Sequence, residues 1–183
     1  MKKIVIVSGS IRTGRLSHRV AVYFQNFIRE KKLAEVVMLD LKELNLPLSE
    51  ERLKYLPDPA PQILRYAEEI KSADAVIVVS PEYNSGYPAS LKNAIDLLYD
   101  EWYRKPVGLA TVSDGNFGGM HVLIMLQTVF LKVRALVVPA TFPVPLVRNN
   151  FDETGNATDK EKTDQRAAKF LAEVMKSTGI DQE

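Results

Sequence analysis

Residues 3–20 read KIVIVSGSIRTGRLSHRV, which is a continuous apolar run, then a polar loop, then the start of a helical pattern. The apolar run Lys3–Ser8 predicts a strand that is buried on both faces. The helical pattern Leu16–Lys32 repeats its apolar residues at spacings of three and four, which predicts an amphipathic helix. A buried strand followed at once by such a helix is typical of a parallel α/β sheet.

The same alternation of strand and helix continues along the rest of the chain. Further apolar runs predict strands at Glu35–Leu41, Ala75–Val79, Pro106–Val112 and Ala135–Thr141. Helices are predicted at Gln62–Ser72, Pro88–Tyr99, Gly119–Val133 and around Ala167, Phe170, Leu171 and Val174. The proline-rich stretch Leu44–Pro61 is expected to be a loop. Five such strands indicate a parallel sheet with helices on both faces, and such sheets bind ligands beyond the carboxyl ends of their strands.

The bulk composition limits the class of protein. With 183 residues, of which 46% are hydrophobic and 26% charged, the chain fits a single domain spanning residues 1–183. The formal net charge is +1, and there is no basic run. These two features argue against binding to nucleic acid or to a membrane surface.

The sequence contains no cysteine, which excludes disulfides, thiolate catalysis and cysteine-based metal sites. Its two histidines, His18 and His121, are isolated and do not suggest a metal site. The apolar run after the N-terminal lysines stops at Ser8, which is too early for a signal peptide. Since no run approaches transmembrane length, we expect a cytoplasmic protein.

The loop between the first strand and the first helix, Gly9–His18, is rich in groups that bind phosphate. A helix N-terminus presents free N–H groups and a positive dipole end, and here the loop adds hydroxyls and guanidinium groups. These come from Ser10, Thr13, Ser17, Arg12 and Arg15. The Walker motif and the dinucleotide motif G-x-G-x-x-G both fail here, which leaves a site for one phosphomonoester. The alternative is a helix that Ser17 caps, with arginines exposed to solvent.

The loops after the third and fourth strands suggest a second part of the same site. Ser80–Pro88 combines prolines and a glycine with tyrosines, an acid and an amide. Rigid backbone donors beside aromatic surface suit a flat heteroaromatic ring, although a turn with exposed tyrosines is the alternative. The glycines of Ser113–Gly119 allow close backbone approach to a ligand, or else a flexible entry into the next helix.

Two segments resemble the NAD(P)H-dependent FMN reductase family, which includes flavodoxin-like quinone, chromate and azo-dye reductases. They are Gly9-Ser10-x-Arg12-x-x-x-x-Ser17 and Pro81-Glu82-Tyr83-Asn84-x-x-x-Pro88-x-x-Leu91-Lys92-Asn93-Ala94-Ile95-Asp96. The resemblance implies FMN as cofactor and NADPH or NADH as hydride donor. It also implies a flavodoxin-like three-layer α/β sandwich, with a five-stranded parallel sheet in the order 2-1-3-4-5 flanked by helices.

The same resemblance assigns cofactor-binding residues. It implies that the FMN phosphate is held by Ser10, Arg12 and Ser17. It implies that the isoalloxazine is lined, largely through backbone groups, by Pro81, Glu82, Tyr83 and Asn84. His18 stands where the family usually has an asparagine. Ser113 and Gly115 belong to a Ser-x-Gly-x-x-Gly-Gly loop near the pyrimidine edge, where backbone N–H groups can stabilise charge on reduced flavin.

One position departs from the family pattern. Many relatives carry an arginine two residues after the double glycine, where it suits the phosphate of a nicotinamide cofactor. This chain has Met120-His121 there. The choice between NADPH and NADH therefore stays open, and His121, as a lone histidine on a helix, is expected to be structural or solvated.

The function expected from the resemblance is turnover at the flavin, with no catalytic side chain. NAD(P)H would reduce FMN at N5, and reduced flavin would then reduce quinones, azo compounds, chromate, ferric chelates or free flavin in a substituted-enzyme mechanism. The alternatives are a flavodoxin-like electron carrier and a flavin-binding module without turnover. Carriers are typically strongly acidic, so the net charge of +1 argues against the first alternative.

The helix Gly119–Val133 is apolar nearly all round. One face carries Val122, Leu126, Val129 and Val133, and the opposite side carries Met120, Ile124 and Leu131. An exposed apolar stripe marks an interaction site, and the resemblance also implies dimers, so we expect a homodimer or homotetramer. Leu97, Trp102 and Tyr103 are expected to extend the patch. The alternative is that the final helix or the loop 142–151 covers the stripe.

Overall fold

The computed structural model describes residues 1–179, and among them it contains one sheet of five parallel strands. The strands are β1 (Lys3–Ser8), β2 (Glu35–Asp40), β3 (Ala75–Pro81), β4 (Pro106–Val112) and β5 (Leu136–Val144). Their order is β2-β1-β3-β4-β5, which confirms the predicted flavodoxin-like sheet. The inner strands β1, β3 and β4 are buried almost throughout, as their continuous apolar runs predicted.

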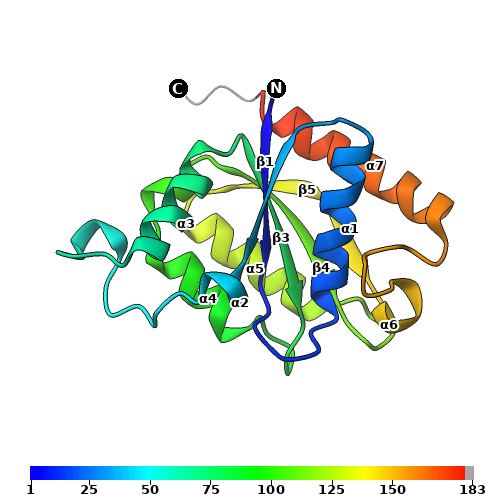
Figure 1. Cartoon of the computed structure of the whole chain (residues 1–183), viewed down its shortest axis with the longest axis horizontal. Coiled ribbons are helices and arrows are strands. Elements are labelled where there is room, and N and C mark those ends of the chain that lie inside the picture. The colour runs from blue at the N-terminus through cyan, green and yellow to red at the C-terminus, as the bar shows by residue number, and fades with distance from the viewer. Residues whose placement is uncertain (180–183) are drawn as a thin grey trace.

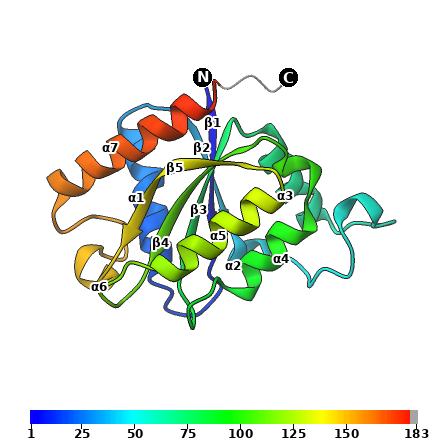
Figure 2. The ribbon, with the colours of Figure 1, turned by 180° about the vertical axis from the view of Figure 1, so that it is seen from behind.

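Figures 1 and 2 show helices on both faces of this sheet. One face is covered by α1 (Ser17–Glu30) and α7 (Lys160–Ser177). The other face is covered by α3 (Pro61–Ser72), α4 (Ala89–Leu97) and α5 (Met120–Lys132). These helices confirm the predicted long helices. None of the helices in residues 1–179 has the length and apolar composition needed to span a bilayer.

Four short elements were not predicted, because a single turn carries no measurable periodicity. They are α2 (Leu41–Leu44), α6 (Val147–Asn150) and the 3-10 turns η1 (Leu53–Tyr55) and η2 (Asp100–Trp102). The turn η1 lies inside the stretch that was expected to be only a loop. The turn η2 follows α4 and ends at Trp102.

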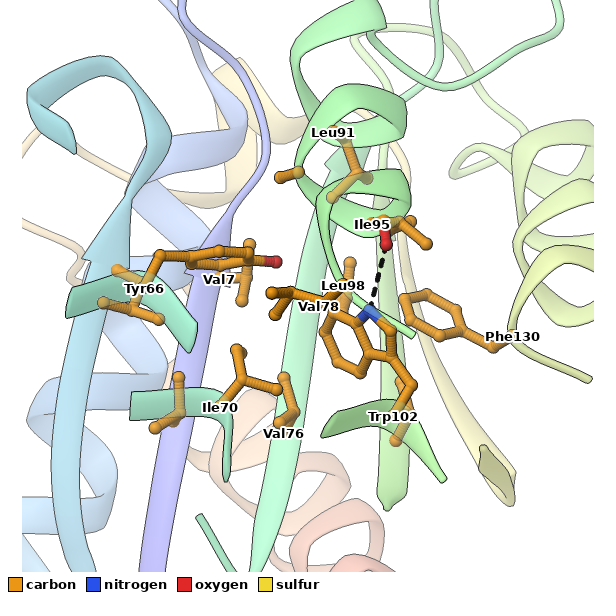
Figure 3. Close-up of a cluster of buried hydrophobic side chains, with 14 of the residues drawn as sticks. Val7, Tyr66, Ile70, Val76, Val78, Leu91, Ile95, Leu98, Trp102 and Phe130 are labelled. Atoms are coloured by element: carbon orange, nitrogen blue, oxygen red, sulfur yellow. Dashed lines mark hydrogen bonds between the residues drawn. The ribbon is translucent and has the colours of Figure 1, made fainter. Parts of the chain in front are cut away.

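Trp102 is fully buried between α4 and α5. Its indole N–H donates to the carbonyl of Ile95 (3.1 Å), and its ring packs edge-on against Phe130, with ring centroids 5.3 Å apart (Figure 3). Leu97 is also fully buried, whereas Tyr103 is exposed. The prediction that Leu97 and Trp102 extend an exposed patch is therefore wrong, because Leu97 packs in the core at the end of α4 and the chain then turns Trp102 inward.

The edge strand β5 is longer and less regular than predicted. Its pairing with β4 continues to Val144, because Ala110–Val112 remain available as partners beyond Thr141. The register shifts between Val107 and Leu109, which marks a bulge. Several residues of β5 are partly or fully exposed, so β5 is not the continuously buried strand that was predicted.

All five strands run in the same direction, so their carboxyl ends share one edge, at the bottom of Figure 1. The loops after β1, β3 and β4 gather along this edge. This is the edge at which open parallel sheets bind ligands. The fold therefore brings together the three loops that the sequence singled out.

Candidate functional site

The loop after β1, residues 9–16, is anchored where it leaves the strand. The Gly9 N–H donates to the carbonyl of Val79 in β3 (2.9 Å). The Ser90 hydroxyl of α4 donates to the Gly9 carbonyl (2.8 Å). These two bonds hold the start of the loop against the neighbouring strand and helix.

Ser10 and Tyr83 join the loops that follow β1 and β3. Their hydroxyls share a hydrogen bond of 2.6 Å, and Ser10 is fully buried. The Arg12 guanidinium lies over the Tyr83 ring, with Cζ 3.5 Å from the ring centroid. The Arg12 N–H also donates to Ser10 Oγ (3.4 Å). A stacked guanidinium keeps its N–H groups at its periphery, so Arg12 can bind an anion while it rests on the ring.

Ser17 is the first residue of α1, and its hydroxyl is buried. Within residues 1–179 this hydroxyl has no hydrogen-bond partner. Leu16 occupies the N-cap position and forms no side-chain cap, so the alternative in which Ser17 caps the helix is wrong. An unpaired buried hydroxyl is unfavourable, and a helix N-terminus favours anions. An oxygen of a bound phosphate would accept a hydrogen bond from the Ser17 hydroxyl, and its negative charge would lie at the N-terminus of α1.

Arg15 forms a bidentate ion pair with Asp40, the last residue of β2. The same guanidinium donates to the Ser10 carbonyl (2.7 Å). Asp40 also accepts a hydrogen bond from the N–H of Lys42 (3.0 Å), which caps α2. The side chains of Arg15 and Asp40 are 11% and 4% exposed. Arg15 is therefore not an exposed arginine, because its ion pair with Asp40 is buried beneath the loop.

His18 points toward the same carboxylate. Its Nδ1 lies 3.0 Å from the Ser8 hydroxyl and 3.7 Å from an oxygen of Asp40. Burial is the main reason that the pKa of His18 falls below its usual 6.5, and the nearby Arg15 lowers it further. Asp40 and Glu43 act in the opposite direction. The lowered pKa favours the uncharged form of His18, and the ring contacts Ser8 and Asp40 beneath the loop.

The loop after β3 ends in a tight two-residue turn. Tyr83 and Gly86 exchange two backbone hydrogen bonds of 2.8 and 2.9 Å. Between them, Asn84 and Ser85 have φ values of 51° and 65°, as a type I′ turn requires. Asn84 is exposed at the tip of this turn. The backbone of the turn is thus fixed, and the side chain of Asn84 is not part of what fixes it.

Glu82 connects the loop after β3 to α5. Its carboxylate accepts hydrogen bonds from the N–H groups of His121 (3.1 Å) and Val122 (3.2 Å). An acid at this position stabilises the N-terminus of a helix. His121 is exposed, and its Nδ1 lies 3.6 Å from the same carboxylate. Pro81, the last residue of β3, is buried.

The loop after β4, residues 113–119, is held by its backbone. The Ser113 N–H donates to the Val144 carbonyl (3.0 Å), and the Ser113 hydroxyl donates to the Gly115 carbonyl (2.9 Å). Gly119 has a φ of 77°, and a Cβ there would lie 3.0 Å from the Cβ of Thr111. Gly115 has open space where a Cβ would be. A side chain at position 119 would be both strained and crowded, whereas position 115 is exposed.

The structure therefore brings all ten predicted site residues to one edge of the sheet. Sequence reasoning missed Asp40 and the capping role of Glu82. The signal for Asp40 is the register of β1 and β2, in which Ser8 lies opposite Asp40, and this register is known only from the structure. The last residues of both strands then meet under the same loop.

A parallel sheet in this order, with a hydroxyl- and arginine-bearing loop after its first strand, defines a flavodoxin-like nucleotide-binding protein. The sequence model of the NADPH-dependent FMN reductases matches residues 2–148. The chain belongs to this family. It is an oxidoreductase, with FMN as cofactor and a reduced nicotinamide nucleotide as electron donor.

Comparison with individual proteins supports the same family assignment. An NAD(P)H-dependent FMN reductase of Saccharomyces cerevisiae is 34% identical over 165 residues, which cover 78% of this chain and 85% of the relative. A quinone reductase of Pseudomonas putida is 29% identical over 166 residues, covering 87% of this chain and 86% of the relative. The fold matches that of the flavoenzyme NAD(P)H:(acceptor) oxidoreductase of Paracoccus denitrificans, with a TM-score of 0.77, 24% identity and 96% of each chain covered.

Proposed function

We propose that the chain uses its FMN to pass electrons from NADPH or NADH to small acceptors. The acceptor classes that suit an open flavin face are quinones, azo compounds, chromate, ferric chelates and free flavin. The Pseudomonas putida relative is named a quinone reductase, which supports the first of these classes. The observation that carries the proposal is the buried, unpaired hydroxyl of Ser17 at the N-terminus of α1.

The phosphate of FMN would be held at this end of the site by three side chains. Ser17 would donate its free hydroxyl, and Arg12 would supply the charge. Ser10 would act from beneath, since its hydroxyl is already bonded to Tyr83. Through its Nδ1, which is engaged with Ser8, His18 would act on the residues that support the loop.

The ring of FMN would be held by the loops after β3 and β4. Pro81, Tyr83 and Asn84 would contribute mainly backbone groups of a rigid turn. Glu82 would orient α5 through its capping carboxylate. Ser113 and Gly115 would place backbone groups near the pyrimidine edge.

When bound, FMN supplies the hydride acceptance and the onward electron transfer. The residues of the chain then bind and orient, and no side chain is needed as nucleophile, base or metal ligand. We propose a substituted-enzyme mechanism, in which the nicotinamide and the acceptor use the same open face in turn.

Steady-state kinetics on FMN-loaded protein tests this proposal. NADH and NADPH are each combined with a panel of quinone, azo, chromate, ferric and flavin acceptors, and oxidation of the nicotinamide is followed. Double-reciprocal plots at several acceptor concentrations should be parallel. Intersecting lines would contradict the shared face, and absence of turnover with every acceptor would favour an electron carrier or a non-catalytic flavin module.

We also propose a homodimer, or a pair of dimers, that associates through α5. Ile124 and Leu131 lie on the outer side of this helix and are 60% and 63% exposed, and Met120 is also exposed. Neither α7 nor the segment 142–151 covers them, so the intramolecular alternative is wrong. An apolar helical stripe of this kind is typical of an interface between proteins.

Light scattering tests the dimer. Two aspartates in the interface, Ile124→Asp with Leu131→Asp, should give a folded monomer. The control is Lys162→Asp with Lys169→Asp, which introduces two aspartates at the same spacing on the exposed side of α7. A parent protein that is monomeric at micromolar concentration would contradict the proposal.

A further inference from the structure

The two arginines of the loop after β1 occupy opposite environments. Arg15 uses both terminal nitrogens, one on Asp40 and the Ser10 carbonyl, the other on Asp40 alone. Within residues 1–179, the Arg12 guanidinium stacks on Tyr83, is exposed, and forms no hydrogen bond. The Arg15 guanidinium is engaged inside the protein through three of its five N–H donors, and the Arg12 guanidinium is available to a ligand.

We propose that Arg15 and Asp40 form a positioning pair, which shapes the loop after β1 and leaves Arg12 as the arginine that binds phosphate. This inference rests on the FMN phosphate site proposed above. Gly14, with a φ of 68°, lets the chain turn back so that Arg15 reaches under the loop. Asp40 is held there by its place at the end of β2 and by its bond to the Lys42 N–H.

The charges of the site support this division of roles. The Arg15 charge is already compensated by a carboxylate in bidentate contact, so the pair offers little net attraction to a phosphate dianion. Arg15 could turn its three engaged N–H groups to a phosphate only by leaving Asp40, and that would strand a buried carboxylate without its partner. The bond from Arg15 to the Ser10 carbonyl instead fixes the backbone just before Arg12.

The variant Asp40→Asn separates the two possible roles of Arg15 by the sign of its effect. Asparagine can still accept the Lys42 N–H bond, so the cap of α2 is retained. If Arg15 is a positioning residue, loss of the ion pair should weaken FMN binding by roughly tenfold. If Arg15 binds phosphate directly, removing the competing carboxylate should leave FMN binding equal or tighter, and that result would overturn the inference.

The readout is the ratio of the dissociation constants for FMN and riboflavin, measured by fluorescence titration of the flavin-free protein. A general loss of structure weakens both flavins alike, whereas a disordered phosphate loop weakens FMN alone. Asp74→Asn is the matched control, since Asp74 also accepts one backbone N–H and one cationic side chain, at the opposite edge of the sheet. Its ratio should equal that of the parent.

A second variant keeps the inference testable if Asp40→Asn does not fold. Arg15→Lys retains the charge but loses the bidentate fork. It should lower the FMN preference as Asp40→Asn does, and an unchanged preference would overturn the positioning role. In the double variant the two losses should not add, because both remove the same pair.

Arg12→Ala in the same titration distinguishes the two proposals. If it leaves the FMN preference unchanged, the phosphate site itself is wrong. If it removes the preference while Asp40→Asn strengthens FMN binding, the site stands and only the positioning role of Arg15 fails.

Discussion

The two ends of the proposed flavin site are built in different ways. The end after β1 depends on side chains: a buried ion pair, the Ser10–Tyr83 bond and the unpaired Ser17 hydroxyl. The end formed by the loops after β3 and β4 depends on backbone conformation, with a type I′ turn and a glycine, Gly119, at which a Cβ would be strained and crowded. Substitutions at the first end should act through the chemical groups that they remove. Substitutions at the second end should act through the backbone φ that they require and the space that they fill.

The largest effect is expected at the backbone-built end, for Gly119→Ala. The new Cβ combines a strained φ of 77° with a 3.0 Å approach to Thr111. We expect the free energy of unfolding to fall by about 2–4 kcal/mol. Chemical denaturation of the flavin-free protein measures it. Gly115→Ala in the same loop meets no atom within 4 Å and should change stability by less than about 0.5 kcal/mol. Equal effects of the two variants would contradict the backbone role.

The next largest effect is expected at the side-chain-built end, for Arg12→Ala. Loss of a charged hydrogen-bond partner removes roughly 1.5–3 kcal/mol, which weakens FMN binding by roughly ten- to a hundredfold. The flavin titration described above measures it, and riboflavin affinity should change much less. The FMN effect should also shrink at high salt, because the contact is ionic and Arg12 is exposed. Equal FMN affinity in variant and parent would remove Arg12 from the site.

Ser17→Ala should separate stability from binding. The flavin-free protein should be as stable as the parent or more stable, because the variant removes a buried hydroxyl without a partner. FMN binding should weaken by roughly tenfold, which corresponds to the low end of the range for a hydrogen bond from a neutral hydroxyl to a charged phosphate. Ser113→Ala is the control, since its hydroxyl already donates to Gly115 and its loss should not stabilise the protein. A clear loss of stability in Ser17→Ala would show that its hydroxyl has a structural role.

The smallest effect is expected for Asn84→Gly. Glycine adopts the φ of 51° at this turn without strain, so the backbone that would face the ring is preserved. FMN affinity should stay within about twofold of the parent value. Asn84→Val, which places a β-branched residue at positive φ, should disturb the turn and weaken binding. A large loss in Asn84→Gly would mean that the amide side chain itself binds the flavin.

How much of the fold and of the site could be predicted from the sequence depends on whether a feature is local or joins distant parts of the chain. The buried runs of β1, β3 and β4 and the helical spacing in α1 are local patterns, so the elements followed from short stretches of sequence. The Arg15–Asp40 pair joins positions far apart in the chain, and it becomes visible only with the register of β1 and β2. The inward turn of Trp102 and the extension of β5 also depend on tertiary partners.

The irregular edge strand β5 has a consequence for how copies of the protein can meet. An exposed strand edge usually invites pairing with a strand of another molecule. Here Pro139 and Pro143 offer no N–H donor, and the Pro143 carbonyl already accepts from Arg166 of α7 (2.7 Å). The sheet therefore resists edge-to-edge growth through β5, which agrees with the proposal that copies associate through the helical face of α5 instead.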